Sequence, residues 1–161
     1  MAMFVHLAPE SKIKTICKTG IRALRRPSGV GVFAMAVTRN FFVSHQWLRE
    51  LKRRNQGPIA GVYFRIPDDE MVWVGHYSQA HQQMTASQAV GLIMTAEGRE
   101  GYEVIVPRRI DSSEIHRVRR LPQVLGWRYY PGSHGKKPCG CPFCQRGEFG
   151  GRKLREEYEK A

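Results

Sequence analysis

Short apolar runs separated by Gly, Pro and acidic turns dominate the first 120 residues of this 161-residue chain. Four runs predict strands, because apolar or β-branched stretches of four to eight residues between turn signals are typical of strands. These runs are Val30–Val37, Ile59–Ile66, Met71–Gly75 and Tyr102–Pro107. The runs do not alternate regularly with long crossover helices. The sequence therefore predicts an α+β fold rather than a doubly wound sheet.

The first helix is expected after a short strand at Phe4–Leu7. Ile13, Ile16 and Cys17 recur there at helical spacing, and Gly20 is a natural helix stop. Cys17 is therefore expected to be a buried structural thiol.

Two further helices are expected from their caps. The second begins after Thr38 or Asn40, either of which can cap it. Its apolar side chains are expected inside, and its cations, including Arg49 and Lys52, outside. The third opens with Thr85-Ala-Ser-Gln88, a capping-box pattern. Residues 110–121 predict a mixture of loop and strand.

The composition changes after Pro122, which divides the chain into a main domain over 1–122 and a small module over 123–161. The module holds Cys139, Cys141 and Cys144, with His134 as the nearest fourth ligand. Such close spacing in an intracellular protein indicates a metal rather than disulfides, and Cys3His is a tetrahedral zinc set. Cys17 is a rival fourth ligand. A redox pair and an iron–sulfur centre are the alternatives.

The net charge is +12, from 26 Lys and Arg against 14 Asp and Glu, with a pI near 10.0. Such an excess, mostly arginine, predicts a polyanionic partner, and nucleic acid is the favoured one. The candidate contacts combine aromatic and guanidinium planes and are Arg119, Arg120, Trp127 and Arg128. The alternatives are a basic surface that serves only solubility, and an aromatic cluster that packs the module onto the main domain.

Four short motifs of the main domain occur in an order that is typical of one known fold. A strand carries Val5-His6-Leu7, and the helix after it ends in Gly20-Ile21. The next strand reads Gly29-Val30-Gly31-Val32-Phe33, and a later one carries Tyr102-Glu103-Val104. In this order the motifs resemble the ADP-ribosyltransferase fold. The branch is the one with a His-Tyr-Glu type triad, which includes poly(ADP-ribose) polymerases and nucleic-acid-modifying toxins. The resemblance covers about residues 4–120 and implies a split sheet with flanking helices.

The resemblance implies a site for NAD, which is the substrate. Glu103 would be the catalytic anion that stabilises positive charge on the ribose, and His6 would bind the adenosine ribose. Phe33 stands where the family has tyrosine, so stacking is kept and one hydrogen bond is lost. The remaining expected NAD contacts are Gly29, Gly31, Arg22 and Arg25, with Arg26 beside them.

Each of these residues also has an ordinary structural interpretation. His6 can be a satisfied core histidine, Phe33 can be plain core, and Glu103 can face solvent. The glycines can mark a turn. His76 and His81 form a metal pair without a third ligand, or belong to a loop lining the site.

Three functions are compatible with these features. The favoured one is an NAD-dependent ADP-ribosyltransferase acting on a nucleic acid or an associated target, with a structural zinc. The others are a non-catalytic, zinc-containing nucleic-acid-binding protein and a decayed NAD-binding relic. Apolar runs far shorter than the ~20 residues of a membrane helix predict a cytoplasmic protein without membrane contact. A toxin role, with an antitoxin or inhibitor as partner, is expected from family habit only.

Overall fold

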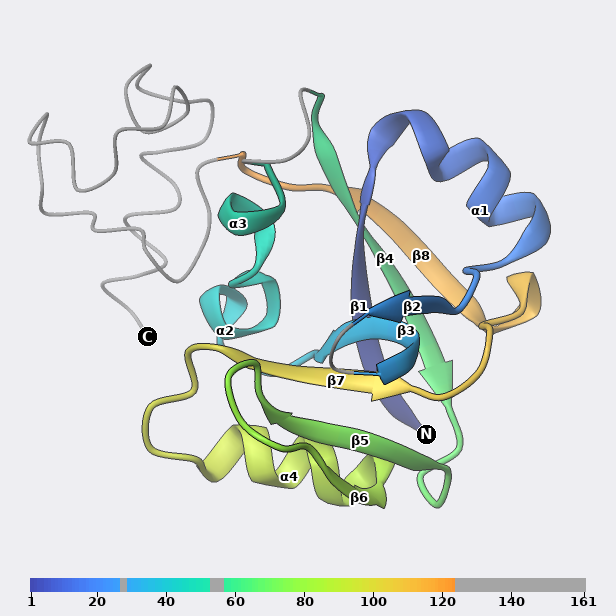
Figure 1. The fold of residues 1–161 in the computed structure, drawn as a ribbon. Coiled ribbons are helices and arrows are strands. Elements are labelled where there is room, and N and C mark those ends of the chain that lie inside the picture. Colours follow the sequence, from blue (N-terminus) through green and yellow to red (C-terminus); the bar gives the residue numbers. More distant parts are fainter. Residues whose placement is uncertain (27–28, 53–56, 124–161) are drawn as a thin grey trace, which may run out of the picture.

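The computed structural model describes residues 1–26, 29–52 and 57–123. The strands are β1 (Ala2–Pro9), β2 (Leu24–Arg26), β3 (Gly29–Ala36), β4 (Ile59–Ile66), β5 (Met71–His76), β6 (Gln82–Thr85), β7 (Tyr102–Val106) and β8 (Ile115–Arg120). The helices are α1 (Ile13–Thr19), α2 (Phe41–His45), α3 (Leu48–Lys52) and α4 (Ala86–Thr95), with 3-10 turns η1 (Glu10–Lys12) and η2 (Ser112–Glu114). Mixed strands and short helices confirm the α+β class (Figure 1).

An eight-stranded sheet runs in the order β6-β5-β7-β3-β1-β4-β8, and β2 pairs with β3 outside this path. The neighbours pair antiparallel. β1 pairs with β4 along its whole length, from Ala2↔Ile66 to Pro9↔Ile59. It pairs with β3 only at Phe4↔Ala36 and Val5↔Met35. The ladder between β1 and β3 therefore stops after two positions, and the sheet divides there.

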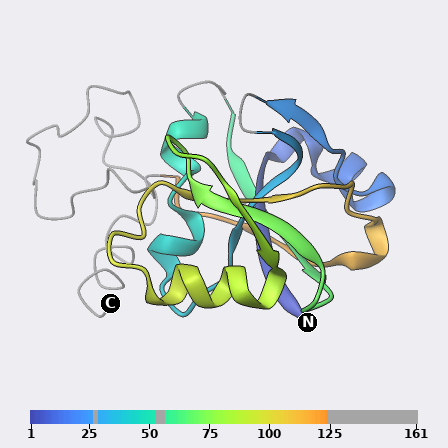
Figure 2. The same ribbon diagram turned by 60° about the horizontal axis from the view of Figure 1, so that its bottom comes forward.

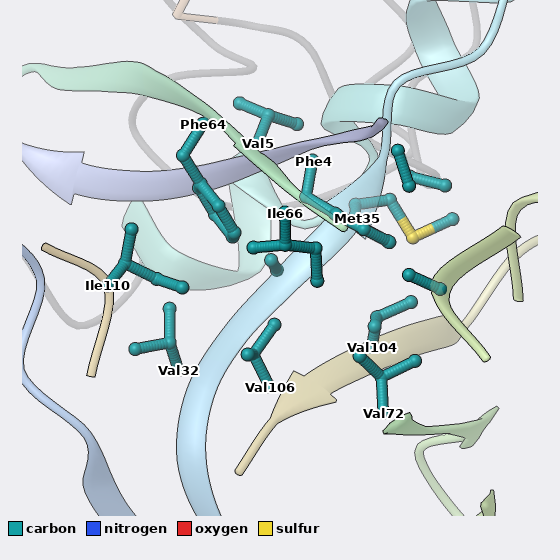
Figure 3. Packing of buried hydrophobic residues seen from close by; sticks show 14 of the residues in the cluster. Phe4, Val5, Val32, Met35, Phe64, Ile66, Val72, Val104, Val106 and Ile110 are labelled. Carbon is teal, nitrogen blue, oxygen red and sulfur yellow. The ribbon is translucent and has the colours of Figure 1, made fainter. Parts of the chain in front are cut away.

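The core lies between the two parts of the divided sheet. Phe4, Phe64 and Ile66 point from β1 and β4 toward Val32 and Val106 on β3 and β7 (Figure 3). All five are buried. Burying a side chain of this size stabilises the fold by roughly 1.5–3 kcal/mol. The burial of these apolar side chains thus stabilises the packing of β1 and β4 against β3 and β7.

Helix α4 extends this core under β5 and β6 (Figure 1, Figure 2). Its buried residues are Ala86, Ala89 and Ile93. The capping box predicted at its start is confirmed, because the Thr85 hydroxyl accepts from the Gln88 N–H and the Gln88 side chain accepts from the Thr85 N–H. This pair satisfies two N–H groups that the helix itself leaves free.

The second predicted helix is divided into α2 and α3, which corrects the expected orientation of its cations. Asn40 caps α2 by accepting from the N–H groups of Phe42 and Val43, as one of the two predicted caps. Arg49 and Lys52, expected outside, are buried. The prediction assumed one continuous periodicity, which the break between α2 and α3 resets. Long cationic side chains can also cover apolar surface with their stems.

The structure overturns the burial expected of Cys17, which is exposed on α1. Only Ile13 and Ile16 of this helix are partly buried against the core. One flank of α1 therefore packs, and Cys17 lies on the other. Gly20 ends the helix as predicted, with φ 81°, and a Cβ there would lie 2.1 Å from the Ile110 carbonyl oxygen. Only glycine combines this φ with such a close approach.

Two strands were not anticipated. The basic stretch 22–29 contains β2, which pairs with the start of β3. β6 pairs with β5 at the edge of the sheet. The mixture of loop and strand predicted over 110–121 is confirmed by η2 and β8. None of the helices in the described part of the chain is long and apolar enough to span a membrane.

Candidate functional site

His6 lies where β1 and β3 separate. Its Nδ1 is 2.7 Å from the Phe33 carbonyl oxygen. A carbonyl only accepts, so Nδ1 carries the proton and donates. Burial lowers the pKa of His6, the Phe33 hydrogen bond partly offsets this, and nearby Arg26 lowers the pKa further. The imidazole is therefore neutral near pH 7 with an accepting lone pair on Nε2. That nitrogen has no hydrogen-bond partner among the described residues.

Phe33 is partly buried on β3, next to this histidine. The guanidinium of Arg26, on β2, lies over its ring, 5.6 Å from the centroid. This distance is within the range of a cation–π interaction. Because neighbouring strand residues point to opposite faces, Arg25 points away from the face that Arg26 shares with Phe33. Arg26 is therefore the arginine that contacts the Phe33 ring and lies near His6.

Glu103 is shielded, with 16% of its side chain exposed. Its Oε1 lies 3.2 Å from the Nε2 of His81, whose side chain is 6% exposed. The contact has ion-pair distance without hydrogen-bond alignment, and His81 Nε2 is fully buried with no hydrogen-bond partner in the described chain. Glu103 thus does not face solvent like an ordinary polar strand residue.

Gly75 makes room for this pair. It sits opposite Glu103 in the β5–β7 ladder. A Cβ at Gly75 would lie 3.1 Å from the Cα of His81 and 3.3 Å from its ring. The missing side chain therefore lets the His81 ring pack on the sheet beside the carboxylate.

The three triad positions come from strands β1, β3 and β7, which are neighbours in the order β7-β3-β1. Phe33 pairs with Ile105, so Phe33 and Glu103 project from one face as diagonal neighbours. Diagonal neighbours in an antiparallel ladder have Cα atoms roughly 7–8 Å apart. The fold thus sets an aromatic ring and a shielded carboxylate on one face of β3 and β7, and the His6 imidazole on β1 donates to the backbone carbonyl of Phe33.

The two glycines expected to approach NAD have a packing explanation as well. A Cβ on Gly31 would lie 2.3 Å from the Val106 carbonyl oxygen, so β3 and β7 need glycine there to meet. Gly29 has φ 142° at the start of β3. Arg22 and Arg25 are exposed. The close approach of β3 and β7 is therefore a structural reason for the glycine at position 31.

The two arginines expected to bind nucleic acid lie next to each other on β8 and point to opposite faces. Arg120 pairs with Glu10 at 2.8 Å. The positive charge of Arg119 lowers the pKa of the Tyr63 hydroxyl, which burial raises overall. Arg117, two residues before Arg119, lies over the Tyr63 ring, 4.8 Å from its centroid. Arg117 and Arg119 have no carboxylate partner in the described parts of the chain.

His81 is the site residue that sequence reasoning did not connect with Glu103. The pairing of β5 with β6 could have pointed to this residue. Val74 pairs with Gln82. This register sets His81 across from Gly75, and a glycine opposite a histidine leaves room for the ring. His76 instead contacts Ser78 through Nδ1 at 2.7 Å. Within the described residues, no group of three or more metal-ligating side chains forms.

The predicted zinc ligands His134, Cys139, Cys141 and Cys144, and the contacts Trp127 and Arg128, lie outside the described residues. We expect purified protein to hold about one zinc per chain, because closed thiolate sites couple metal binding to folding. Elemental analysis checks this. Freely titrating thiols in metal-free, folded protein would contradict it, and Cys17→Ser is the control that should leave the zinc content unchanged.

Comparison of the chain with protein-family models, curated proteins and solved structures finds no match.

Proposed function

We propose that this protein is an NAD-dependent ADP-ribosyltransferase whose acceptor is a nucleic acid. The observation that carries the proposal is the shielded carboxylate of Glu103, one diagonal step from Phe33 and two strands from His6 in the order β7-β3-β1. These are the positions that the resemblance assigns to the triad. The division of the sheet between β1 and β3 is a second support, since the resemblance implies a split sheet.

The carboxylate suits the chemistry. Transfer breaks the bond between nicotinamide and ribose and leaves positive charge on the ribose ring. A fixed anion in a site with little water stabilises such charge more than an anion in water does. Glu103 meets this need because its side chain is largely buried.

The neutral imidazole of His6 suits a ribose hydroxyl. Its Nδ1–H is already used on the Phe33 carbonyl, which fixes the ring. The accepting Nε2 can then receive a hydrogen bond from a hydroxyl group. A protonated imidazole could not accept, so the lowered pKa of His6 favours this role.

Arg26 and Phe33 suit the rest of NAD. The cation of Arg26 is near His6 and has no carboxylate partner among the residues described. An arginine of this kind can meet a pyrophosphate. The Phe33 ring offers an aromatic surface but no hydroxyl, so the site has one hydrogen bond fewer than the family pattern.

The direct test is incubation of the whole chain with NAD, with and without single-stranded DNA or RNA. We expect released nicotinamide and ADP-ribose attached to the nucleic acid. If the protein neither consumes NAD nor binds it by calorimetry, the proposal is wrong. The second candidate, a non-catalytic nucleic-acid-binding protein, would then remain, because Arg117 and Arg119 favour polyanion binding without any chemistry.

The salt dependence of single-strand binding tests whether Arg117 and Arg119 contact the nucleic acid. The double change Arg117→Gln, Arg119→Gln should lower the log–log salt slope of single-strand binding by about 1.4, because each phosphate contact contributes about 0.7. Fluorescence anisotropy at several salt concentrations measures it.

Arg120→Gln is the matched control. Arg120 lies on the same strand but is paired with Glu10, so its removal should change the slope little. Equal slopes for the wild type and the double variant, with circular dichroism showing both folded, would exclude these arginines as phosphate contacts.

A further inference from the structure

Trp73 presents an aromatic surface that the described fold leaves open. Burial alternates along β5, with Val72 and Val74 buried against the core and Trp73 39% exposed on the other side of the sheet. Helix α4 packs on the core side of β5 (Figure 2). Met71 is 42% exposed on the same side as Trp73. Within the described residues the indole has no hydrogen-bond or ring partner, so Trp73 and Met71 form an open apolar patch.

This patch adjoins the carboxylate of Glu103. Trp73 pairs with Ile105 and Gly75 pairs with Glu103, so Trp73 and Glu103 are diagonal neighbours on one side of the sheet. Their Cα atoms are therefore roughly 7–8 Å apart. Phe33 pairs with the same Ile105 from the opposite edge of β7. Glu103 thus has an aromatic residue one diagonal step away on either flank of its strand.

We propose that Trp73 stacks the acceptor base of a single-stranded nucleic acid beside Glu103. This deepens the proposed function and rests on it. The nicotinamide nitrogen leaves with the electron pair of its bond to the ribose carbon. The base supplies the pair for the new bond and releases its proton to water. Attack opposite the leaving group places two flat rings on different sides of the ribose, with Phe33 as the surface for nicotinamide and Trp73 as the surface for the base.

The charges on this side of the sheet suit a nucleic acid. Arg26 lies here, over the Phe33 ring. Pairing carries the same side from β3 across to β8 through Met35, Val5, Tyr63 and Arg117. Neither Arg26 nor Arg117 has a carboxylate partner in the described chain. Free guanidinium groups bind phosphates and an open indole stacks a base, and an unpaired strand offers both.

The first experiment compares two probes by fluorescence anisotropy with the whole chain. One is a single strand that carries bases, and the other has the same length and backbone but no bases. Each pair is made as DNA and as RNA, so the tighter pair identifies the sugar. Trp73→Leu keeps apolar bulk and loses the ring, so it should weaken binding of the base-bearing probe by on the order of tenfold. Binding of the abasic probe should not change.

Matched variants distinguish stacking from folding. Trp73→Phe keeps a ring and should recover most of the affinity for the base-bearing probe. Met94→Ala removes a side chain that is 44% exposed on α4, on the other side of β5, and should bind both probes like the wild type. A loss in Trp73→Leu that is equal for both probes, or no loss at all, would overturn the proposal.

A second measurement needs only the wild type to be folded. The NMR signal of the Trp73 indole N–H, assigned with Trp73→Phe, should shift when the base-bearing probe is added and stay in place with the abasic probe. The same signal shift with both probes would refute stacking. A wild-type dimer that becomes a monomer in Trp73→Leu, with both probes bound equally, would assign the patch to a second copy of the chain instead.

Activity separates the two proposals. Trp73→Leu should raise the KM for the nucleic acid by on the order of tenfold, with a smaller change in the KM for NAD. If NAD is not consumed while the base-dependent difference is found, the transferase proposal fails and the base site stands. If ADP-ribose is transferred but Trp73→Leu binds the two probes as the wild type does, the transferase stands and the role of Trp73 is refuted.

Discussion

Glu103→Gln should reduce NAD turnover by a factor on the order of 10² to 10³ while leaving NAD binding nearly intact. The amide keeps the shape of the side chain and loses its charge, and removing one electrostatic stabiliser of a transition state typically costs this much. NAD binding should persist, because His6 and Arg26 are untouched. Nicotinamide release measures turnover, and calorimetry measures binding.

Two variants make this result interpretable. Glu100→Gln removes an exposed carboxylate three residues away and should leave turnover unchanged. His6→Ala should instead weaken NAD binding with a smaller effect on the chemical step, the kinetic mark of lost ground-state binding. An active wild type with equally active Glu103→Gln would show that the catalytic anion is another residue.

The free energy of unfolding should fall steeply between neutral and mildly acidic pH because of His45. This side chain is buried in α2, with Nδ1 2.7 Å from the Phe41 carbonyl oxygen and Nε2 2.6 Å from the Tyr63 hydroxyl. Nδ1 donates to the carbonyl, so Nε2 accepts from the hydroxyl. Burial lowers the pKa of His45 from 6.5 to about 4, against the Phe41 hydrogen bond, and Arg119 and Arg117 lower it further.

The sign follows from proton binding. Between pH 6.5 and about 4 the unfolded chain takes up the proton and the folded chain does not. Stability is therefore fully present above pH 6.5, is lost as the pH falls through this window, and the loss levels off below the folded pKa. From pH 7 to about pH 4.5 we expect a loss of roughly 2 kcal/mol from this residue. His6, whose pKa is also lowered, adds in the same direction.

Urea unfolding at the two pH values measures the loss. His45→Gln should be less stable at pH 7, since the Tyr63 hydroxyl loses its partner, and should show a smaller difference between the two pH values. His116→Gln, at an exposed position, should keep the full difference. An unchanged pH dependence in His45→Gln would mean that His45 is not the group responsible.

Much of the local structure follows from the sequence because it depends on neighbours along the chain. The capping box at Thr85 and Gln88, the cap at Asn40 and the stop at Gly20 involve residues at most four apart. Apolar runs of strand length also identify β3, β4, β5 and β7, since burial on a sheet requires that composition.

Failures of prediction occurred where another part of the chain decides. Cys17 has helical spacing from Ile13, but only one flank of α1 has a partner to pack against. Arg49 is buried, although a single continuous helical periodicity placed it outside. β2 forms because it can pair with the start of β3. The composition of residues 22–29, three arginines among eight residues, does not indicate a strand.

The sequence by itself determined the α+β class and identified His6, Phe33 and Glu103 as separate candidates, because strand periodicity and short motifs are local properties. Only the tertiary structure decided that β7, β3 and β1 lie side by side, and that His81 meets Glu103 across Gly75. It also decided that Arg26, rather than Arg25, covers Phe33. The physical reason is that strand order and pairing register join residues far apart in the chain. No local pattern of residues encodes the loop closures that bring them together.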